Sequence, residues 1–497
     1  MLVHTLYVLE PASMSFFSEC YFFRLWYNSY IVLSRKHFVR GIMMNQTFHK
    51  KDKLKQLLFI LIPILITQFG MFSMNFFDTM MSGKYSPNDL AGVAIGSSIW
   101  VAVFSGLSGI LLAITPIVSQ LVGGKKENEV AFNVIQAVYL SLIMGLSIIL
   151  VGAALLNPIL DIMSLESEVR RISHDYLVAL SYGILPLFIY NVLRSFIDAL
   201  GKTRVSMIIT LTALPLNVFF NYVLIFGKFG FPKLGGVGAG YASTLTYWLI
   251  MALALYVIIR HQPFSSYRLF ARVYTISFSK WKEILLIGVP IGLSIFFETS
   301  IFSAVTMLMS VFDTITIASY QAAINFASFM YMIPLSISMA LTILVGFEVG
   351  AKRFKDAKEY SWIGVVMGVS MAFLTGLILI LFRFDIAGLY TNDHEVLQLT
   401  SHFLLYALFF QLSDAIQAPI QGALRGYKDV NITFIMSLVS YWVIGLPLGY
   451  FLATYTDWGP YGYWIGLISG LAVGALSLSG RLIVIQKRQT FSKNISS

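Results

Sequence analysis

The chain has 497 residues, of which 57% are hydrophobic and only 12% charged, and its mean hydropathy is +0.77. A soluble domain carries about 25% charged residues, so this composition excludes a soluble globular protein, and the apolar content excludes a disordered chain. The net charge of +10 is interpreted as a sign of membrane topology rather than of nucleic-acid binding. What remains is a membrane protein with many spanning helices, in which the single cysteine, Cys20, excludes an internal disulfide.

Residues 1–43 differ from the rest of the chain, because charged side chains interrupt every apolar run. No window there is clean enough to span a bilayer or to form the core of a signal peptide. Met43 and Met44 are followed by a basic stretch and then by the first strong apolar run. We hypothesise that translation starts near Met43 or Met44, so that the residues before them are not native. Residues 1–55 are then an N-terminal extension and a cytoplasmic segment.

Twelve apolar runs follow, and each is long enough to cross a bilayer as a helix. The predicted spans are 56–81, 90–118, 132–156, 173–197, 205–226, 238–259, 283–308, 317–347, 361–383, 400–423, 431–453 and 461–484. The longest internal linker, 260–282, divides them into two groups of six, at 56–259 and 283–484, and leaves a tail at 485–497. The predicted fold class is therefore an all-α membrane protein with twelve transmembrane helices.

Basic residues gather in every second loop. The segment before the first span and the loops after the even-numbered spans hold most of them: Lys50, Lys51, Lys53, Lys55, Lys125, Lys126, Lys202, Arg204, the 260–282 linker, Lys352, Arg353, Lys355, Lys358, Arg425 and Lys428. Because cytoplasmic loops are rich in Lys and Arg, this pattern predicts that both termini lie in the cytoplasm. We expect a multi-pass protein of the cell (inner) membrane.

The two groups of six spans also repeat in sequence. Pro63 aligns with Pro290 at an offset of 227 residues, and segment 115–126 aligns with 342–353 at the same offset. A third match, near Gly201, has an offset of 225. Six spans in each repeat give both repeats the same orientation. This pattern predicts two six-helix bundles related by a pseudo-twofold axis along the membrane normal, with a cavity between them.

Three acidic residues lie inside predicted spans, where an ionisable side chain is costly and is a functional candidate by default. They are Asp78, Glu298 and Asp414. Glu298 has no basic residue within one helical turn, so its carboxyl group is expected to favour the protonated form. Such a group is suited to bind and release H⁺, or to bind Na⁺ through its oxygens. The structural alternative for each acid is a buried hydrogen bond or cap between helices.

Uncharged polar residues accompany these acids. In the tenth span, spacings of three, three and four place four side chains on one helical face: Gln411, Asp414, Gln417 and Gln421. This stripe is predicted either to line the cavity or to form a polar seam between helices. The same two interpretations apply to Asn217 and Asn221, one turn apart in the fifth span. Structural ion pairs are expected for Arg194 with Asp198 and for Glu348 with Lys352.

Three segments together resemble the multidrug and toxic compound extrusion (MATE) transporters: Gln68-Phe-Gly-Met-Phe-Ser-Met-Asn-Phe-Phe-Asp78-Thr-Met-Met-Ser-Gly83, Pro215-Leu-Asn217 leading to Gly227-Lys-Phe-Gly-Phe-Pro232, and Gln417-Ala-Pro-Ile-Gln421-Gly-Ala-Leu-Arg425-Gly-Tyr-Lys. The resemblance covers about residues 50–485. It implies an antiporter that expels lipophilic organic cations and drugs in exchange for Na⁺ or H⁺, by alternating access of two six-helix bundles.

The resemblance also implies roles for single residues. In NorM-like members an acidic cation site lies in the C-terminal bundle, and Glu298 and Asp414 match its motif positions. Asp78 matches the N-terminal acid of DinF-like members, which have Asn and Asp one turn apart in the fifth span. Here the second of those positions is Asn221. We therefore assign cation coupling, including a Na⁺ site, to Glu298 and Asp414. A secondary cation or substrate site is assigned to Asp78, Asn217 and Asn221.

Two other functions are alternatives to this one. A flippase for a lipid-linked sugar, a transporter of related architecture, would need a cationic cavity, whereas the basic residues lie almost entirely in loops, with Arg194 the nearest exception. A membrane enzyme would need a nucleophile or metal-ligand cluster, and the sequence offers none. We expect no catalytic residue and no cofactor beyond the coupling ion. The expected partners are small organic cations and the lipid bilayer, without nucleic acid, for a monomeric protein.

Overall fold

The computed structural model describes residues 46–47, 49–163 and 165–496. The region of the hypothesised start at Met43 or Met44 lies outside this part of the chain. All the regular structure within it is helical, as expected. Eleven of its helical segments are long and apolar enough to cross a membrane, and a bent pair of helices supplies a twelfth span. The predicted fold class is therefore confirmed.

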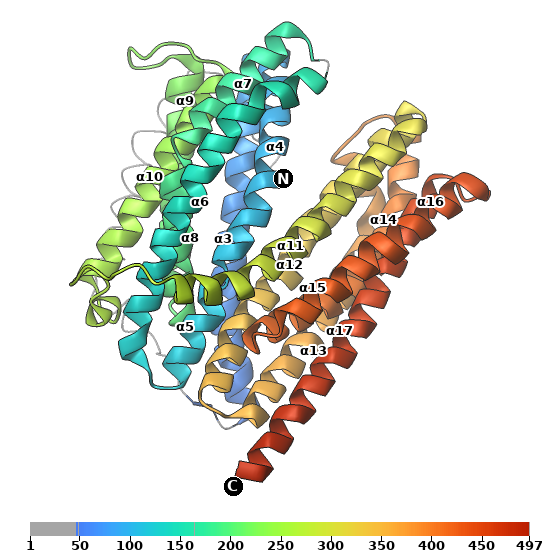
Figure 1. Ribbon diagram of the computed structural model, residues 1–497. Coiled ribbons are helices and arrows are strands. Elements are labelled where there is room, and N and C mark those ends of the chain that lie inside the picture. The colour runs from blue at the N-terminus through green and yellow to red at the C-terminus, as the bar shows by residue number, and fades with distance from the viewer. Residues whose placement is uncertain (1–45, 48, 164, 497) are drawn as a thin grey trace.

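The N-terminal bundle and the C-terminal bundle each contain six spans (Figure 1). The helices of the first are α3 (Lys50–Tyr85), α4 (Pro87–Leu111) with α5 (Ile114–Gly123), α6 (Glu127–Ile162), α7 (Ser167–Ser181) with α8 (Ile184–Ala199), α9 (Thr203–Phe226) and α10 (Gly236–Arg260). The helices of the second are α11 (Phe278–Leu308), α12 (Thr314–Gly350), α13 (Phe354–Gly388), α14 (His394–Gly426), α15 (Val430–Leu438) with α16 (Leu446–Tyr455), and α17 (Pro460–Ser496).

Three details differ from the predicted spans. The fourth span is not continuous, because α7 and α8 meet at an angle of 52° around Gly183. Pro186 has no N–H group and is best tolerated in the first turn of a helix, which is where it lies in α8. The eleventh span contains a π-helical segment, Val439–Gly445, between α15 and α16. In addition, α17 continues to Ser496, through the residues expected to form a tail.

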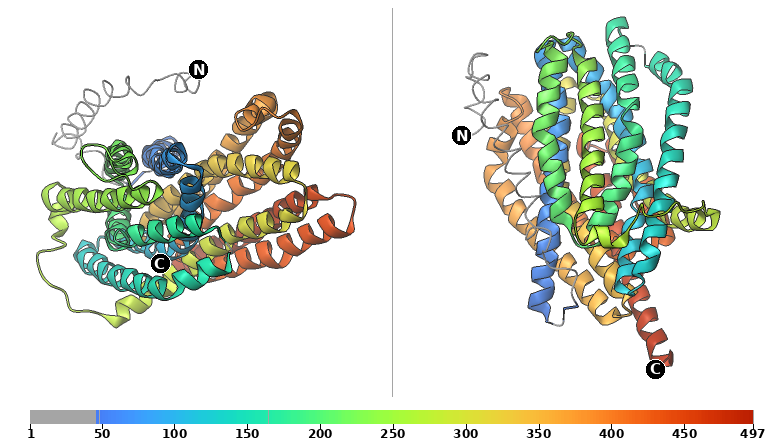
Figure 2. Two further views of the ribbon diagram at one scale, coloured as in Figure 1. Left: turned by 90° about the horizontal axis from the view of Figure 1, so that it is seen from above. Right: turned by 90° about the vertical axis from the view of Figure 1, so that its left-hand side faces the viewer.

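The two bundles approach each other at one end and diverge at the other (Figure 1). We call the end where α3 begins and α17 finishes the closed end, and the opposite end the open end. Seen from above, α6–α10 lie on one side and α11–α17 on the other (Figure 2). The blue helix α3 lies between the two groups. The loops predicted to be basic and cytoplasmic, such as 124–126 and 351–353, lie at the closed end.

Glycine residues bring the bundles into direct main-chain contact at the closed end. A Cβ atom at Gly123 of α5 would overlap the carbonyl group of Phe347 on α12, and one at Gly350 would overlap the carbonyl group of Gln120. The Gln120 side chain then donates a hydrogen bond of 2.8 Å from Nε2 to the carbonyl oxygen of Gly426. Small residues thus let helices of the two repeats pack closely in the membrane.

Gly123→Ala is expected to lower the free energy of unfolding by about 1–3 kcal/mol, because the added methyl group overpacks this contact. The matched control is Gly152→Ala in α6, where a Cβ atom would have no neighbour within 4 Å. Thermal melting of the purified protein in detergent measures both changes. A melting temperature for Gly123→Ala equal to that of the control would contradict the close contact.

Candidate functional site

The two acids assigned to cation coupling lie in one buried cluster of the C-terminal bundle. Glu298 comes from the middle of α11 and Asp414 from α14, and their exposed fractions are 8% and 4%. The Tyr331 hydroxyl on α12 donates a hydrogen bond of 2.8 Å to Oε1 of Glu298. The two carboxyl groups are close enough to interact electrostatically. The fold thus brings together two acids that are 116 residues apart in sequence.

Asp414 has an unusual environment for a buried acid. In the described part of the chain, neither a hydrogen bond nor an ion pair is found for its carboxyl group, and its electrostatic neighbour is the like charge of Glu298. Burying a carboxylate without donors is unfavourable, and a nearby carboxylate adds repulsion. The pair can be relieved by a proton or by a cation that uses the free oxygens as ligands.

The glutamines of the predicted stripe are buried, and each one donates to another helix of the same bundle. Gln411 donates to Thr375 of α13 at 2.7 Å, and Gln417 donates to the Tyr441 hydroxyl in the π-helical segment at 2.5 Å. Gln421 donates to Ser437 at 3.4 Å and also lies beside Glu298. These contacts favour the polar-seam interpretation of the stripe over the cavity-lining one.

The secondary site predicted in the N-terminal bundle is also a single cluster. Asn221 donates from Nδ2 to Oδ1 of Asp78 at 2.5 Å and to Oδ1 of Asn217 at 3.2 Å. The other carboxyl oxygen of Asp78 accepts a 2.7 Å hydrogen bond from Ser243 of α10, a residue that sequence reasoning missed. Unlike Asp414, Asp78 therefore has a donor at each oxygen. The cluster joins α3, α9 and α10 within one bundle.

A cavity lies between the bundles, toward the closed end, and both repeats line it. Thr115 and Thr342, which align at the repeat offset of 227, both contribute to its wall. Arg194 and Asp198 also line it and form the expected ion pair at 3.4 Å. Asp78, Glu298 and Asp414 are not among its lining residues.

Arg425 connects this cavity to the acidic cluster. The sequence assigned it to a cytoplasmic loop, but α14 extends three residues beyond the predicted end of the span, to Gly426, and buries the arginine side chain. Its guanidinium group lines the cavity and interacts electrostatically with Glu298. Arg425 thus lies between the cavity wall and the surroundings of Glu298.

A family model matches the chain twice, once in each bundle. The model named MatE matches residues 63–223 and 290–451, and the two matches begin 227 residues apart.

The chain belongs to the MatE family.

Curated relatives in this family match nearly the whole chain. One is a "Probable multidrug resistance protein NorM" from Halalkalibacterium halodurans, 58% identical over 445 residues, which covers 90% of this chain and 97% of the relative. A protein of the same name from Bacillus subtilis is 58% identical over 452 residues and covers 91% of this chain and 100% of the relative. This MatE protein is accordingly a transporter and not an enzyme.

Solved structures of MatE transporters share the fold at low sequence identity. A eukaryotic MATE transporter is 22% identical, with a TM-score of 0.80 over 89% of this chain and 98% of that structure. An outward-facing multidrug resistance MATE family transporter is 17% identical, with a TM-score of 0.81 over 90% of this chain and all of that structure.

The acidic cluster presents several oxygen atoms in a small buried space. Within the described residues, no group of three or more His, Cys, Asp or Glu side chains could hold a metal ion. Two carboxyl groups and the Tyr331 hydroxyl oxygen are oxygen ligands of the kind that hard cations prefer. In this MatE chain the cluster therefore combines two carboxyl groups with one hydroxyl group.

Proposed function

We propose that this protein is a cation-coupled multidrug efflux antiporter. It exports lipophilic organic cations in exchange for Na⁺ or H⁺, by alternating access of its two bundles. The observation that supports this most directly is the buried pair Glu298 and Asp414, found in a chain 58% identical to proteins named as probable multidrug resistance proteins. The other proposed assignments are a monomer in the inner membrane, with both termini in the cytoplasm.

The proposed coupling rests on competition for negative charge. Na⁺ or H⁺ binds Glu298 and Asp414 from outside and relieves the repulsion between the two carboxyl groups. Neutralising Glu298 removes the counter-charge of Arg425, so the cavity between the bundles becomes more positive and releases a cationic drug. Coupling then follows because each ligand binds one conformation better than the other.

The shape of the protein agrees with one step of such a cycle. If the basic closed end faces the cytoplasm, as the positive-inside rule predicts, the open end faces outward. This is the state that would bind the coupling ion and release the drug. The chain's aromatic residues, 15% of the total, and its 20 methionines supply adaptable apolar contacts for varied drugs.

A flippase for a lipid-linked sugar is the second candidate, and one observation favours it. Arg194 and Arg425 both line the cavity between the bundles, and guanidinium groups suit a pyrophosphate. Arg194, however, is already paired with Asp198 at 3.4 Å, and the charge of Arg425 is partly balanced by the nearby carboxyl group of Glu298. Movement of a fluorescent lipid pyrophosphate in proteoliposomes, without transport of ethidium, would favour the flippase.

Everted membrane vesicles test the antiport and identify its ion. We expect ethidium uptake to be driven either by a Na⁺ gradient at fixed pH or by a pH gradient in Na⁺-free buffer, and to collapse when an ionophore dissipates the driving gradient. Vesicles from cells without the protein are the control. If neither gradient drives ethidium above that control, the antiport proposal is wrong.

A further inference from the structure

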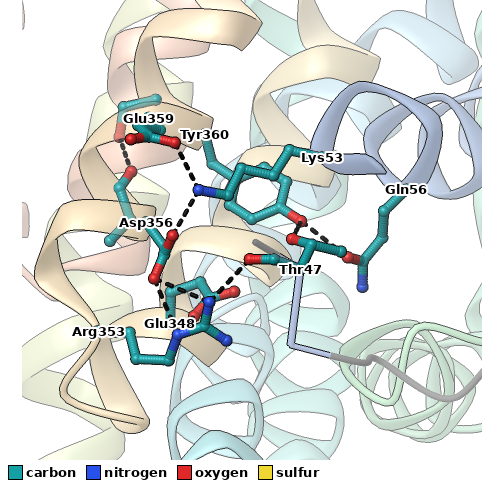
Figure 3. A network of polar contacts seen from close by, with 10 residues as sticks. Thr47, Lys53, Gln56, Glu348, Arg353, Asp356, Glu359 and Tyr360 are labelled. Atoms are coloured by element: carbon teal, nitrogen blue, oxygen red, sulfur yellow. Dashed lines mark hydrogen bonds and ion pairs between the residues drawn. The ribbon is translucent and has the colours of Figure 1, made fainter. Parts of the chain in front are cut away.

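A buried lysine crosses the boundary between the bundles at the closed end. Lys53, in the first turn of α3, is 0% exposed. Its Nζ atom lies 2.5 Å from Oδ1 of Asp356 and 2.5 Å from Oε2 of Glu359, both on α13 of the other bundle (Figure 3). One fully buried cation of the N-terminal bundle thus pairs with two acids of the C-terminal bundle.

Further contacts extend this ion pair into a network. Arg353 donates from Nε to Asp356 at 2.8 Å and from Nη2 to the main-chain oxygen of Thr47 at 2.8 Å (Figure 3). Glu348 lies 3.4 Å from Arg353, so its partner is this arginine rather than the predicted Lys352. The Tyr360 hydroxyl donates to Gln56 at 2.7 Å and so ties α13 to α3 a second time. All these contacts are made where the bundles meet.

The sequence repeat predicts an equivalent ion pair between the bundles on the opposite side of the closed end, at a place we call the second corner. The structure does not form that ion pair. At the offset of 227, Lys280 corresponds to Lys53 and Glu129 corresponds to Asp356. Lys280 instead pairs with Glu283 of its own helix at 2.9 Å, and Glu129 pairs with Lys126 at 3.5 Å. No ion pair joins the two bundles at this corner within the described ranges.

The chain itself joins the bundles at that second corner. The linker between α10 and α11 passes there, and Gln136 of α6 holds it by donating to the Thr275 carbonyl oxygen at 2.7 Å. Gln136 also accepts a hydrogen bond of 2.9 Å from the main-chain N–H of Ser277. The two views in Figure 2 place this linker and the first turn of α3 on opposite sides of the molecule.

We propose that Lys53, Asp356 and Glu359 form a latch that holds the closed end shut, opposite a hinge at the linker corner. Covalent continuity limits how far the bundles separate at the hinge, whereas ion pairs at the latch can break and become hydrated. The closed end then opens asymmetrically, by a swing about the linker. This inference rests on the alternating access of the proposed function.

The latch is tested by distances between spin labels rather than by transport. In a Cys20→Ser background, Lys51→Cys and Lys358→Cys report the latch corner, and Asn128→Cys with Lys282→Cys report the hinge corner; all four sites are exposed. Lys53→Met retains the apolar length of the side chain and removes its charge. At the latch corner, we expect the ratio of the open (long-distance) population to the closed (short-distance) population to rise at least fivefold. The distance distribution at the hinge corner should change little.

Three companion variants keep the test decisive. Lys280→Met, at the equivalent position of the other repeat, should leave both distance distributions as in the parent. Lys53→Arg retains the charge and should restore the closed population, and Glu359→Gln replaces Lys53→Met if the latter does not fold. An unchanged latch distance in the charge-removing variant, or equal opening at both corners, would overturn the proposal. Because no ligand or gradient is used, a failure of the antiport proposal would leave this result interpretable.

Discussion

Replacing Glu298 with glutamine is expected to reduce ion-driven ethidium transport at least tenfold. The amide keeps an oxygen that can accept the 2.8 Å hydrogen bond from Tyr331, so the local packing is retained. It can neither take up a proton near neutral pH nor offer a negative charge to Na⁺. Losing one charge-assisted contact costs about 1.5–3 kcal/mol, which corresponds to roughly a ten- to hundredfold change in affinity for the ion.

Glu395→Gln is the matched control for this experiment. Glu395 is an exposed acid in the first turn of α14, in the same bundle, so the same chemical change is made away from the buried cluster. Initial rates are compared in everted vesicles at equal protein levels. Full coupled transport by the Glu298→Gln variant would refute the assignment of Glu298 as a coupling residue.

Asp414→Asn is expected to abolish coupled transport and, at the same time, to raise the melting temperature. The carboxyl group of Asp414 has no hydrogen-bond donor among the described residues and faces the like charge of Glu298. A neutral amide of the same shape removes both the unpaired buried charge and the repulsion, each of which opposes folding. A gain in stability combined with a loss of function is typical of residues that are retained for activity.

Asp78→Asn provides the contrast, because the carboxyl group of Asp78 has a donor at each oxygen. An amide has a single acceptor oxygen, so either Asn221 or Ser243 loses its acceptor. The expected cost is about 1–3 kcal/mol, and the melting temperature should fall. Melting curves of both variants in the same detergent make the comparison. If Asp414→Asn melts below the parent as well, the Asp414 carboxyl group holds helices together and is not a free ion site.

Apolar runs predicted the number of spans, and the repeat offset predicted two equivalent bundles, because bilayer thickness and duplication leave direct marks on a sequence. The buried acids were found for the same reason: a charge in an apolar run is costly and therefore conspicuous. Their partners were not found. Tyr331 and Ser243 are ordinary residues of membrane helices, and only the packing of distant helices gives them a carboxyl group to contact.

Two basic residues were interpreted as topological markers alone, and the structure gives each of them a buried contact. Arg425 was placed in a loop because α14 is the least apolar of the single-helix spans, so hydropathy ended the helix early. Lys53 lies in a run of lysines that looks like a solvated cytoplasmic segment. Its burial depends on α13, which begins 301 residues later in the sequence. Local charge patterns cannot distinguish an exposed lysine from one that a distant helix covers.

The π-helical turn in the eleventh span changes how that span should be drawn as a helical wheel. Through the turn, buried residues recur every four residues, at Ser437, Tyr441, Gly445 and Gly449. Three turns of an α-helix would span about eleven residues rather than these twelve, so the π-helical turn adds one residue to this face. The extra residue resets the angular phase of α16 relative to α15. Gly449 is thereby aimed at Gly466 of α17, where the two backbones touch. An unbroken wheel over 430–455 would assign the wrong face to the lipid, so alignments of this span need a one-residue phase correction after Gly445.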